Sequence, residues 1–311
     1  MFQMKRVLDN FLRLIPDYVY ISLLYFKHLH RFPNLRHPRT FNEKLQWLKL
    51  HDRKPEYTMM VDKIKVKEYV ANLIGEEYII PTLATYKHVD DIDIDKLPNQ
   101  FVIKWNHDSG SVVICKDKAT FNWNKAKEKL RKGETKNGFW YGREWPYKNV
   151  KPMLLAEKYM EDNNEVVKTV RSASQSNEKA PMLNDYKFYC FNGEPKIMFI
   201  SSDRANNVCF DYYDMNLNHL DLKQGGENYK GQVKLPTNFK EMKDLAAKVS
   251  QNIPHVRTDF YEVNGRVYFG ELTFFDSSGF AKFSPKVWDE KLGDLIVLPN
   301  FLVGIIIYML G

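Results

Sequence analysis

The segment VRTDFYEVNGRVYFGELTF (256–274) carries two acidic residues, Asp259 and Glu271, on strands predicted to form a β-hairpin. Which side of the sheet each carboxylate faces depends on the register. A two-residue turn at 264–265 would place the two side chains on opposite faces. A three-residue loop at 263–265 with a glycine bulge would place both on one face.

In the second register Arg257, Asp259, Glu271 and Thr273 share a face. Two nearby carboxylates repel unless a proton or a cation lies between them, so this arrangement favours a bound divalent ion. Oxygen ligands alone favour Mg²⁺ or Mn²⁺, which also coordinate substrate phosphates. The alternative interpretation is an exposed strand edge with solvated acids and Arg257 as their partner.

A second candidate site lies in FVIKWNHDSGSVVI (101–114), where Lys104 ends an apolar run just before a polar loop with Gly110. Two β-rich runs around a turn-forming cluster predict a hairpin. Because glycine accepts unusual backbone angles, the amides at 107–111 can converge on one point and bind an anion beside the lysine. An ordinary surface hairpin with a solvated lysine is the alternative.

These candidate residues need a packed scaffold, and the chain can supply one. Of its 311 residues 44% are hydrophobic and 14% aromatic, which is enough to bury a sizeable core. Strands paired in hairpins, rather than in βαβ units, predict an α+β fold. We expect helices at 41–52, 57–75, 124–132 and 236–253, and strands at 101–114, 153–160 and 185–201.

Three cysteines, Cys115, Cys190 and Cys209, show neither metal-type spacing nor an even count. They predict free thiols in a reducing compartment, and therefore a cytoplasmic protein.

The formal charge of +7 is concentrated at the N-terminus, because residues 1–60 contain 11 Lys/Arg and 5 Asp/Glu. This asymmetry predicts an anionic partner, and no nucleic-acid motif accompanies it. The aromatic and basic segment 11–32 is too interrupted for a transmembrane helix or signal peptide. It predicts a helix packed on the domain or lying at a membrane interface, and the apolar tail 299–311 also suits peripheral contact with the plasma membrane.

Five motifs occur in an order that resembles the ATP-grasp superfamily, specifically its TupA-like branch, named for teichuronopeptide biosynthesis. The resemblance covers roughly residues 40–298. The motifs are DK at 62–63, FVIK with its loop at 101–111, AEKYM at 156–160, DYKFYCFNGEP at 185–195, and VRTDFY with FGELTF at 256–274.

The resemblance implies two α+β subdomains that clasp a nucleotide, preceded by a helical N-terminal region. The implied divisions are a basic helical region at 1–60, an N-terminal α/β part at 61–97, a lid subdomain at 98–157, a C-terminal subdomain with the metal hairpin at 158–298, and the tail at 299–311.

It also implies contacts to ATP. The phosphates would be contacted by Lys63 and Lys104 and covered by the loop at 106–111, with Ser109, Gly110 and Ser111. The hinge that binds adenine would be Glu157, Lys158, Tyr159 and Met160, and Asp185 would hold the ribose.

Catalytic and metal roles follow from the same resemblance. Lys187 and Arg257 would face the phosphates or an acyl phosphate, and Asp259, Glu271 and Thr273 would bind Mg²⁺ or Mn²⁺. The family more often has asparagine at the position of Thr273, which is still an oxygen donor.

The implied function is an ATP- and Mg²⁺-dependent ligase that forms an amide through an acyl phosphate in cell-surface polysaccharide biosynthesis. Its acceptor would be a saccharide, a uronic acid or an amino acid. The alternatives are an ATP-dependent glycan kinase, a glycosyltransferase that uses the acids of DYYD (211–214), and a membrane-docked scaffold without catalysis.

Overall fold

The computed structural model describes residues 12–162, 183–202 and 208–299. The segment 161–184 is polar with few apolar positions, which predicts a mobile loop, and most of it lies outside these residues. Nearly all of the apolar tail (299–311) also lies outside them. The α+β class predicted from the sequence is confirmed. The helices are α2 (Asp17–Leu29), α3 (Phe41–His51), α4 (Glu56–Val61), α5 (Lys65–Ile74), α6 (Trp123–Glu134), α7 (Gly138–Gly142), α9 (Phe239–Val249) and α10 (Val287–Asp294).

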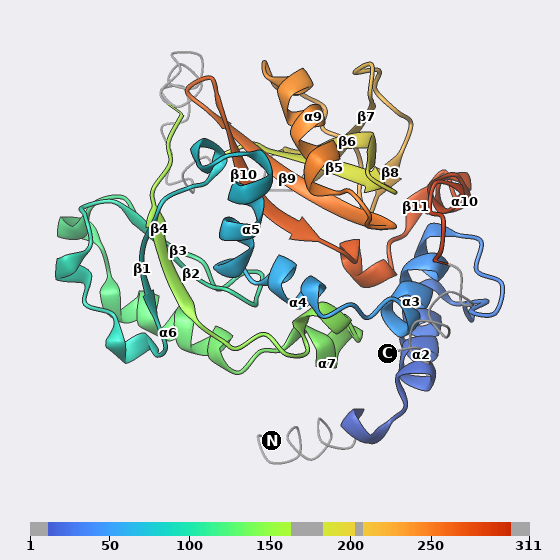
Figure 1. Cartoon of the computed structure of the whole chain (residues 1–311), viewed down its shortest axis with the longest axis horizontal. Coiled ribbons are helices and arrows are strands. Elements are labelled where there is room, and N and C mark those ends of the chain that lie inside the picture. Colours follow the sequence, from blue (N-terminus) through green and yellow to red (C-terminus); the bar gives the residue numbers. More distant parts are fainter. Residues whose placement is uncertain (1–11, 163–182, 203–207, 300–311) are drawn as a thin grey trace.

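Two antiparallel sheets organise the described part of the chain (Figure 1). The small sheet has the order β1-β4-β2-β3, the large sheet has the order β10-β9-β5-β6-β7, and β11 and β8 form a separate pair. The strands are β1 (Thr82–Tyr86), β2 (Phe101–Trp105), β3 (Val113–Cys115), β4 (Leu154–Lys158), β5 (Asp185–Phe191), β6 (Glu194–Ser202), β7 (Cys209–Asp214), β8 (Lys223–Gln224), β9 (His255–Val263), β10 (Arg266–Thr273) and β11 (Phe283–Ser284).

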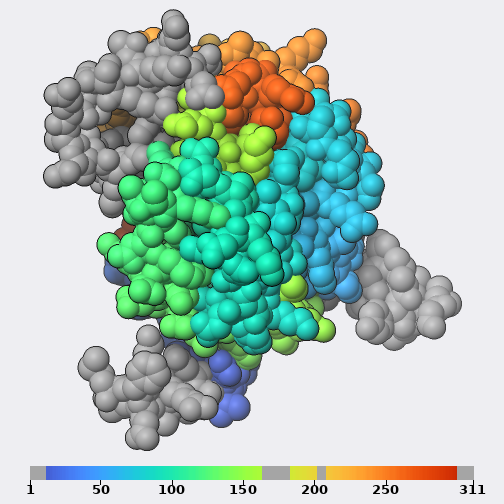
Figure 2. Space-filling view, turned by 90° about the vertical axis from the view of Figure 1, so that its left-hand side faces the viewer, coloured from blue at the N-terminus to red at the C-terminus, as the bar shows by residue number. Residues whose placement is uncertain are grey.

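The small sheet contains the hairpin predicted at 101–114. Alternate residues of β2 are fully buried, as expected for a strand with one face on a core, and α6 covers that face with Ala126 and Leu130. Strand β1 pairs with β4, so the expected boundary between residues 97 and 98 falls within one sheet. Figure 2 views the molecule from this side, with the blue segment that contains α2 at its lower end.

The large sheet shares its core with helices from the N-terminal part of the chain. Helices α3, α4 and α5 contribute Phe41, Met60 and Val70 to the cluster that also contains Phe188 and Phe260. Residues 41–74 therefore pack as part of the large-sheet subdomain, although the sequence places them more than a hundred residues before β5.

The single helix predicted over 57–75 is wrong, because α4 ends at Val61 and α5 begins at Lys65. At the break, the Asp62 carboxylate accepts a hydrogen bond from the backbone N–H of Ile64 (2.9 Å), and such local bonds compete with helix continuation. The backbone N–H of Lys63 then donates to the Asn106 carbonyl (3.1 Å) in the loop after β2. The break thus brings Lys63 to the β2–β3 loop.

The hairpin β9–β10 differs from both registers considered above. Its turn is the two-residue one, with Asn264 and Gly265 at φ 52° and 74°, so the three-residue loop is wrong. A bulge at Gly270 then shifts the register by one residue, and Glu271 lies directly opposite Asp259. The two carboxylates therefore share one face because of the bulge, and not because of the turn.

Candidate functional site

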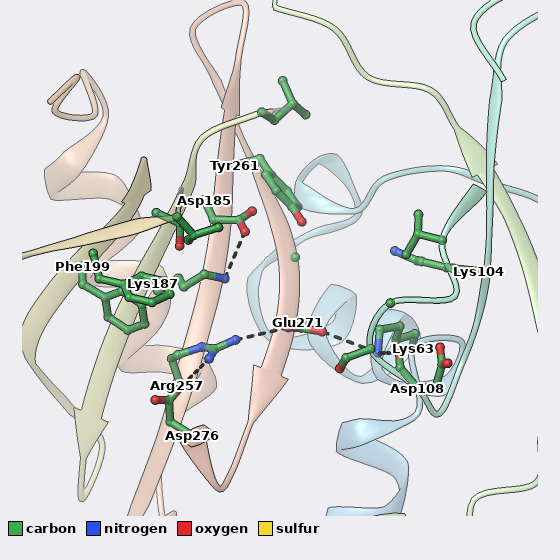
Figure 3. Close-up of a pocket in the computed structure, with 18 of the residues that line it drawn as sticks. Lys63, Lys104, Asp108, Asp185, Lys187, Phe199, Arg257, Tyr261, Glu271 and Asp276 are labelled. Atoms are coloured by element: carbon green, nitrogen blue, oxygen red, sulfur yellow. Dashed lines mark hydrogen bonds and ion pairs between the residues drawn. The ribbon is translucent and has the colours of Figure 1, made fainter. Parts of the chain in front are cut away.

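A cavity of about 900 Å³ lies between the small and large sheets, and we call it the intersheet cavity. Figure 3 shows side chains of both sheets pointing into it. The predicted site residues that line it are Lys63, Lys104, Ser109, Gly110, Glu157, Lys158, Tyr159, Met160, Asp185, Lys187, Arg257 and Glu271. The predicted residues Ser111, Asp259 and Thr273 do not line it.

Asp259 lies beneath two cations that do line the intersheet cavity. Because β5 and β9 pair in register, Lys187 is opposite Asp259, and its Nζ lies 2.5 Å from Asp259 Oδ2. Arg257 contacts the same carboxylate with two nitrogens, Nε at 2.7 Å and Nη2 at 2.8 Å. Lys187 also lies 3.1 Å from Asp185, so one acid–base cluster joins β5 to β9.

Glu271 approaches the same guanidinium from β10. Its Oε1 lies 3.2 Å from Arg257 Nη2, the nitrogen that also contacts Asp259. Thr273 is the cross-strand partner of Arg257 and therefore lies on the same face. The four residues predicted to share a face do so, with the arginine between the two carboxylates.

A third carboxylate, Asp276, contacts Arg257 through Nη1 and was missed by sequence reasoning. Its Oδ2 accepts hydrogen bonds from Tyr189 (2.9 Å) and from Gln224 Nε2 (2.8 Å). Asp276 lies just after β10, in a loop whose sequence, DSSG, gave no signal beyond a turn. Arg257 is thus fixed by carboxylates on three sides.

Lys63 connects the large-sheet side of the cavity to the loop after β2 (Figure 3). Its Nζ lies 3.5 Å from Glu271 Oε2 and donates to the Asp108 carbonyl at 3.1 Å. The Asp108 side chain accepts from Ser111 Oγ (2.5 Å) and contacts Lys136 (3.1 Å). Ser111 therefore stabilises this loop by an internal hydrogen bond. Its side chain is buried in the loop and does not line the cavity.

Glu157 lies between two lysines at the point where β4 leaves the small sheet. Lys104 Nζ is 2.5 Å from Oε2, and Lys67 Nζ is 2.6 Å from Oε1. Lys67 also donates to the Ile80 carbonyl (2.8 Å) and to Thr82 Oγ1 (2.9 Å), and so joins α5 to the small sheet. Sequence reasoning missed Lys67, because it belongs to none of the five motifs.

A family model described as TupA-like ATPgrasp matches residues 43–297. The chain belongs to the TupA-like ATP-grasp family. Its two sheets and intersheet cavity are therefore those of an ATP-grasp fold. No curated protein matches this ATP-grasp chain.

Solved structures similar to this TupA-like protein include two D-alanine–D-alanine ligases and the ATP-grasp ligase PsnB with its minimal precursor. The ligase from Bacillus anthracis, complexed with ATP, is 13% identical with a TM-score of 0.41, over 76% of this chain and 63% of that one. The ligase from Helicobacter pylori is 15% identical with a TM-score of 0.43, over 83% of this chain and 69% of that one. PsnB is 7% identical with a TM-score of 0.40, over 83% of this chain and 63% of that one. The chain thus spans about two thirds of the length of these structures.

Several residues of the cavity lining were not predicted from the sequence. They include Phe199, which lies across the cavity from Lys104 in Figure 3, together with Phe210, Phe280 and Gln224. His28 of α2, which precedes the family match, stacks on Phe280 with ring centroids 5.0 Å apart. The acids of DYYD, Asp211 and Asp214, do not belong to the lining.

The cations of the cavity keep its acids ionised. Burial raises the pKa of Glu157, but Lys104 and then Lys67 outweigh this effect and the net pKa is lowered. Burial likewise opposes charging of Lys187, yet Asp259 raises its pKa above the ordinary value. Arg257 remains protonated, because its carboxylate partners, Asp259 first, raise its pKa against the cost of burial.

Proposed function

We propose that this TupA-like ATP-grasp protein is an ATP- and Mg²⁺-dependent ligase that joins a carboxylate to an amine during the assembly of a cell-surface polysaccharide. One observation carries the proposal. Lys104 approaches one cavity from the small sheet, Lys187 and Arg257 approach it from the large sheet, and Lys63 approaches it from the segment between α4 and α5. Four cations around one space suit a ligand with several phosphates.

ATP would lie across the cavity from the hinge to the large sheet. The strand end at Glu157–Met160 would bind adenine through its backbone, and Asp185 would accept a hydrogen bond from the ribose. Lys63 and Lys104 would contact the phosphates, and the loop with Ser109, Gly110 and Ser111 would cover them. Gly110 has φ 117°, which lets the loop amides turn toward an anion.

Two acids of the β9–β10 hairpin, Asp259 and Glu271, are oxygen donors of the kind that Mg²⁺ or Mn²⁺ prefers, and an ion there would replace Lys187 and Arg257 as the partner of Asp259. Among the described residues, no group of three His, Cys, Asp or Glu forms a complete metal site. Mg²⁺ usually takes only one or two carboxylates together with phosphate oxygens, and Asp259 and Glu271 supply two on one face. They would hold the ion, with Thr273 as a further oxygen donor. The ion would neutralise charge on the phosphates.

The chain's own residues would promote two displacements. A substrate carboxylate oxygen attacks the terminal phosphorus, ADP leaves, and an acyl phosphate forms. An amine then attacks the carbonyl carbon, phosphate leaves, and the nitrogen loses a proton. Arg257 and Lys187 would stabilise the negative charge that develops on the transferred phosphoryl group and on the carbonyl oxygen.

The acceptor would be a saccharide, a uronic acid or an amino acid. Three phenylalanines in the lining, Phe199, Phe210 and Phe280, would offer apolar surface to a sugar ring, and Gln224 would offer polar contacts. The enzyme would work in the cytoplasm, at the inner face of the plasma membrane. Within the described ranges, no helix has the length and apolar character needed to cross a bilayer.

The test combines ATP, Mg²⁺, candidate uronic acids and amines, and measures ADP, phosphate and amide together. We expect equal amounts of all three, and a Glu271→Gln variant with turnover reduced about 10² to 10³-fold. Glu262→Gln, on the same hairpin but outside the cavity lining, is the matched control. Phosphate retained on a sugar hydroxyl would indicate a glycan kinase, and failure to bind ATP in calorimetry would reject the proposal.

A further inference from the structure

Helix α2 and its flanks expose an unusual number of large hydrophobic side chains. On the helix itself they occupy one side, because residues 18, 19, 23 and 26 lie within about 140° of arc at 100° per residue. Phe32 extends this surface, since its ring stacks on Phe26 with centroids 4.8 Å apart. The exposed fractions are 81% for Leu14, 54% for Tyr18, 44% for Val19, 52% for Leu23, 46% for Phe26 and 61% for Phe32.

This apolar side belongs to a helix that is firmly attached to the domain. The inward side buries Tyr20, Ile21 and Tyr25. Asp17 forms ion pairs with Arg53 (2.6 Å) and Arg143 (3.0 Å), which lie far along the chain. The exposed side chains therefore form a ridge on a firmly held helix, and Figure 1 shows α2 at the lower right of the molecule.

The segment that carries the ridge is mostly basic. Residues 12–40 contain five Lys or Arg and one acid, Asp17, and that acid is engaged with Arg53 and Arg143. The exposed basic residues are Arg13, Lys27, Arg31, Arg36 and Arg39, of which Arg31 is paired with Glu43 and Asp289 from neighbouring elements. An apolar helix side with basic flanks is complementary to a lipid bilayer, which has an apolar acyl-chain region beneath anionic headgroups.

We propose that the outer side of α2 docks on an anionic lipid bilayer, with Leu23, Phe26 and Phe32 inserted among the acyl chains and the basic flanks on the headgroups. Nucleic acid or an acidic protein would satisfy the charges but would leave these side chains without an apolar partner. The proposal rests on the surface of α2 and is independent of the ligase reaction. His28, on the inward side of the same helix, lines the intersheet cavity, so docking would hold the cavity close to the membrane.

Flotation of the full chain tests the proposal, with vesicles of phosphatidylglycerol and phosphatidylcholine in equal parts against vesicles of phosphatidylcholine alone. We expect binding to the anionic vesicles that weakens at high salt. The double variant Leu23→Glu/Phe26→Glu should bind at least about 10-fold less, because it removes apolar area and adds repulsion from the headgroups. The matched control is Leu73→Glu/Leu235→Glu, two exposed hydrophobic residues away from α2, which should float like the wild type.

Equal flotation of the α2 variant and the wild type, or no binding of the wild type to anionic vesicles, would overturn the proposal. So would a concentration-dependent dimer that the α2 variant abolishes, because the ridge would then face a second copy of the chain. Thermal melts confirm that each variant is folded. ATP affinity, measured on the same samples, should not change in the α2 variant, so a failure of docking is distinguished from a failure of the proposed enzyme.

Discussion

Glu271 lies directly opposite Asp259 in the β9–β10 ladder because Gly270 is an extra residue in β10. Without this bulge the two-residue turn would place Gly270 opposite Asp259, and the Glu271 side chain would face away from the intersheet cavity. The position of one carboxylate therefore depends on one residue that has no side chain.

Filling the bulge should therefore damage the site. A Cβ at Gly270 would lie 3.0 Å from the Asp259 carbonyl and 3.1 Å from the Tyr261 ring, so the larger side chain of Gly270→Val would crowd the backbone of β9. We expect turnover to fall about 10² -fold, since a shift near 1 Å is enough for such a loss, and the melting temperature to fall as well. Gly226→Ala, where a Cβ meets no atom within 4 Å, is the control and should behave as the wild type. Normal turnover in a folded Gly270→Val variant would contradict the importance of the register.

Asp276 should act through Arg257. The Asp276→Asn substitution keeps the shape of the side chain but removes one of the charges that fix the guanidinium. We expect kcat to fall about 10-fold with little change in the KM for ATP, because the nucleotide contacts remain. The exposed substitution Asp244→Asn should leave both constants unchanged. A rise in the KM for ATP alone would place Asp276 in nucleotide binding instead.

Lys67 should tune the affinity for ATP without touching the nucleotide. In the Lys67→Met variant, Glu157 keeps only Lys104 as its lysine partner and draws it away from the phosphates. We expect the Kd for ATP to rise about 10-fold, a free-energy change of roughly 1.4 kcal/mol. The exposed Lys65 on the same helix provides the control, Lys65→Met. Adding Glu157→Gln should remove most of the effect in a double-mutant cycle, and strictly additive effects would refute the coupling.

Acid should destabilise the protein partly through Glu271. Burial raises the pKa of this group, but Lys63 and then Arg257 outweigh burial and lower it to about 2 from 4.5. A carboxylate with a lowered pKa stabilises the fold above its unfolded value, and this stabilisation is lost as the pH falls through the folded pKa. We expect the free energy of unfolding to fall between pH 4.5 and about 2, and to fall less steeply in Glu271→Gln. Denaturant titrations across this range measure the difference, and equal slopes would rule it out.

Much of the fold follows from local pattern. The apolar run of β2, the turn residues at 264–265 and the apolar stripe of α9 are visible in the sequence, and they indicate the α+β class. The break at Asp62 was not predicted, because it depends on a side chain bonding to its own backbone and on the loop after β2. Hydrophobic periodicity continues through the break and hides it.

The candidate site was predicted in part, for a related reason. The order of the motifs predicted one site that contains Lys63, Lys104, Lys187, Arg257 and Glu271. All five residues line the intersheet cavity. The motif order missed Asp276 and Lys67, because each acts by contacting another charged side chain rather than by belonging to a motif. The bulge at Gly270 could not be predicted either. A glycine in a strand suggests a bulge, but it does not show how the bulge changes the pairing of the neighbouring residues.

The alternation of charges along the cavity, from Asp276 through Arg257, Glu271 and Lys63 to the loop at Asp108, affects how a nucleotide is recognised. Neighbouring opposite charges cancel each other's field at distances larger than their separation, and salt screens what remains beyond about one Debye length, ~10 Å at 0.1 M. The cavity therefore exerts little long-range attraction on an approaching polyanion. The association rate with ATP should therefore depend only weakly on ionic strength. Discrimination between nucleotides should arise after entry, from the direct contacts that each phosphate makes in the cavity.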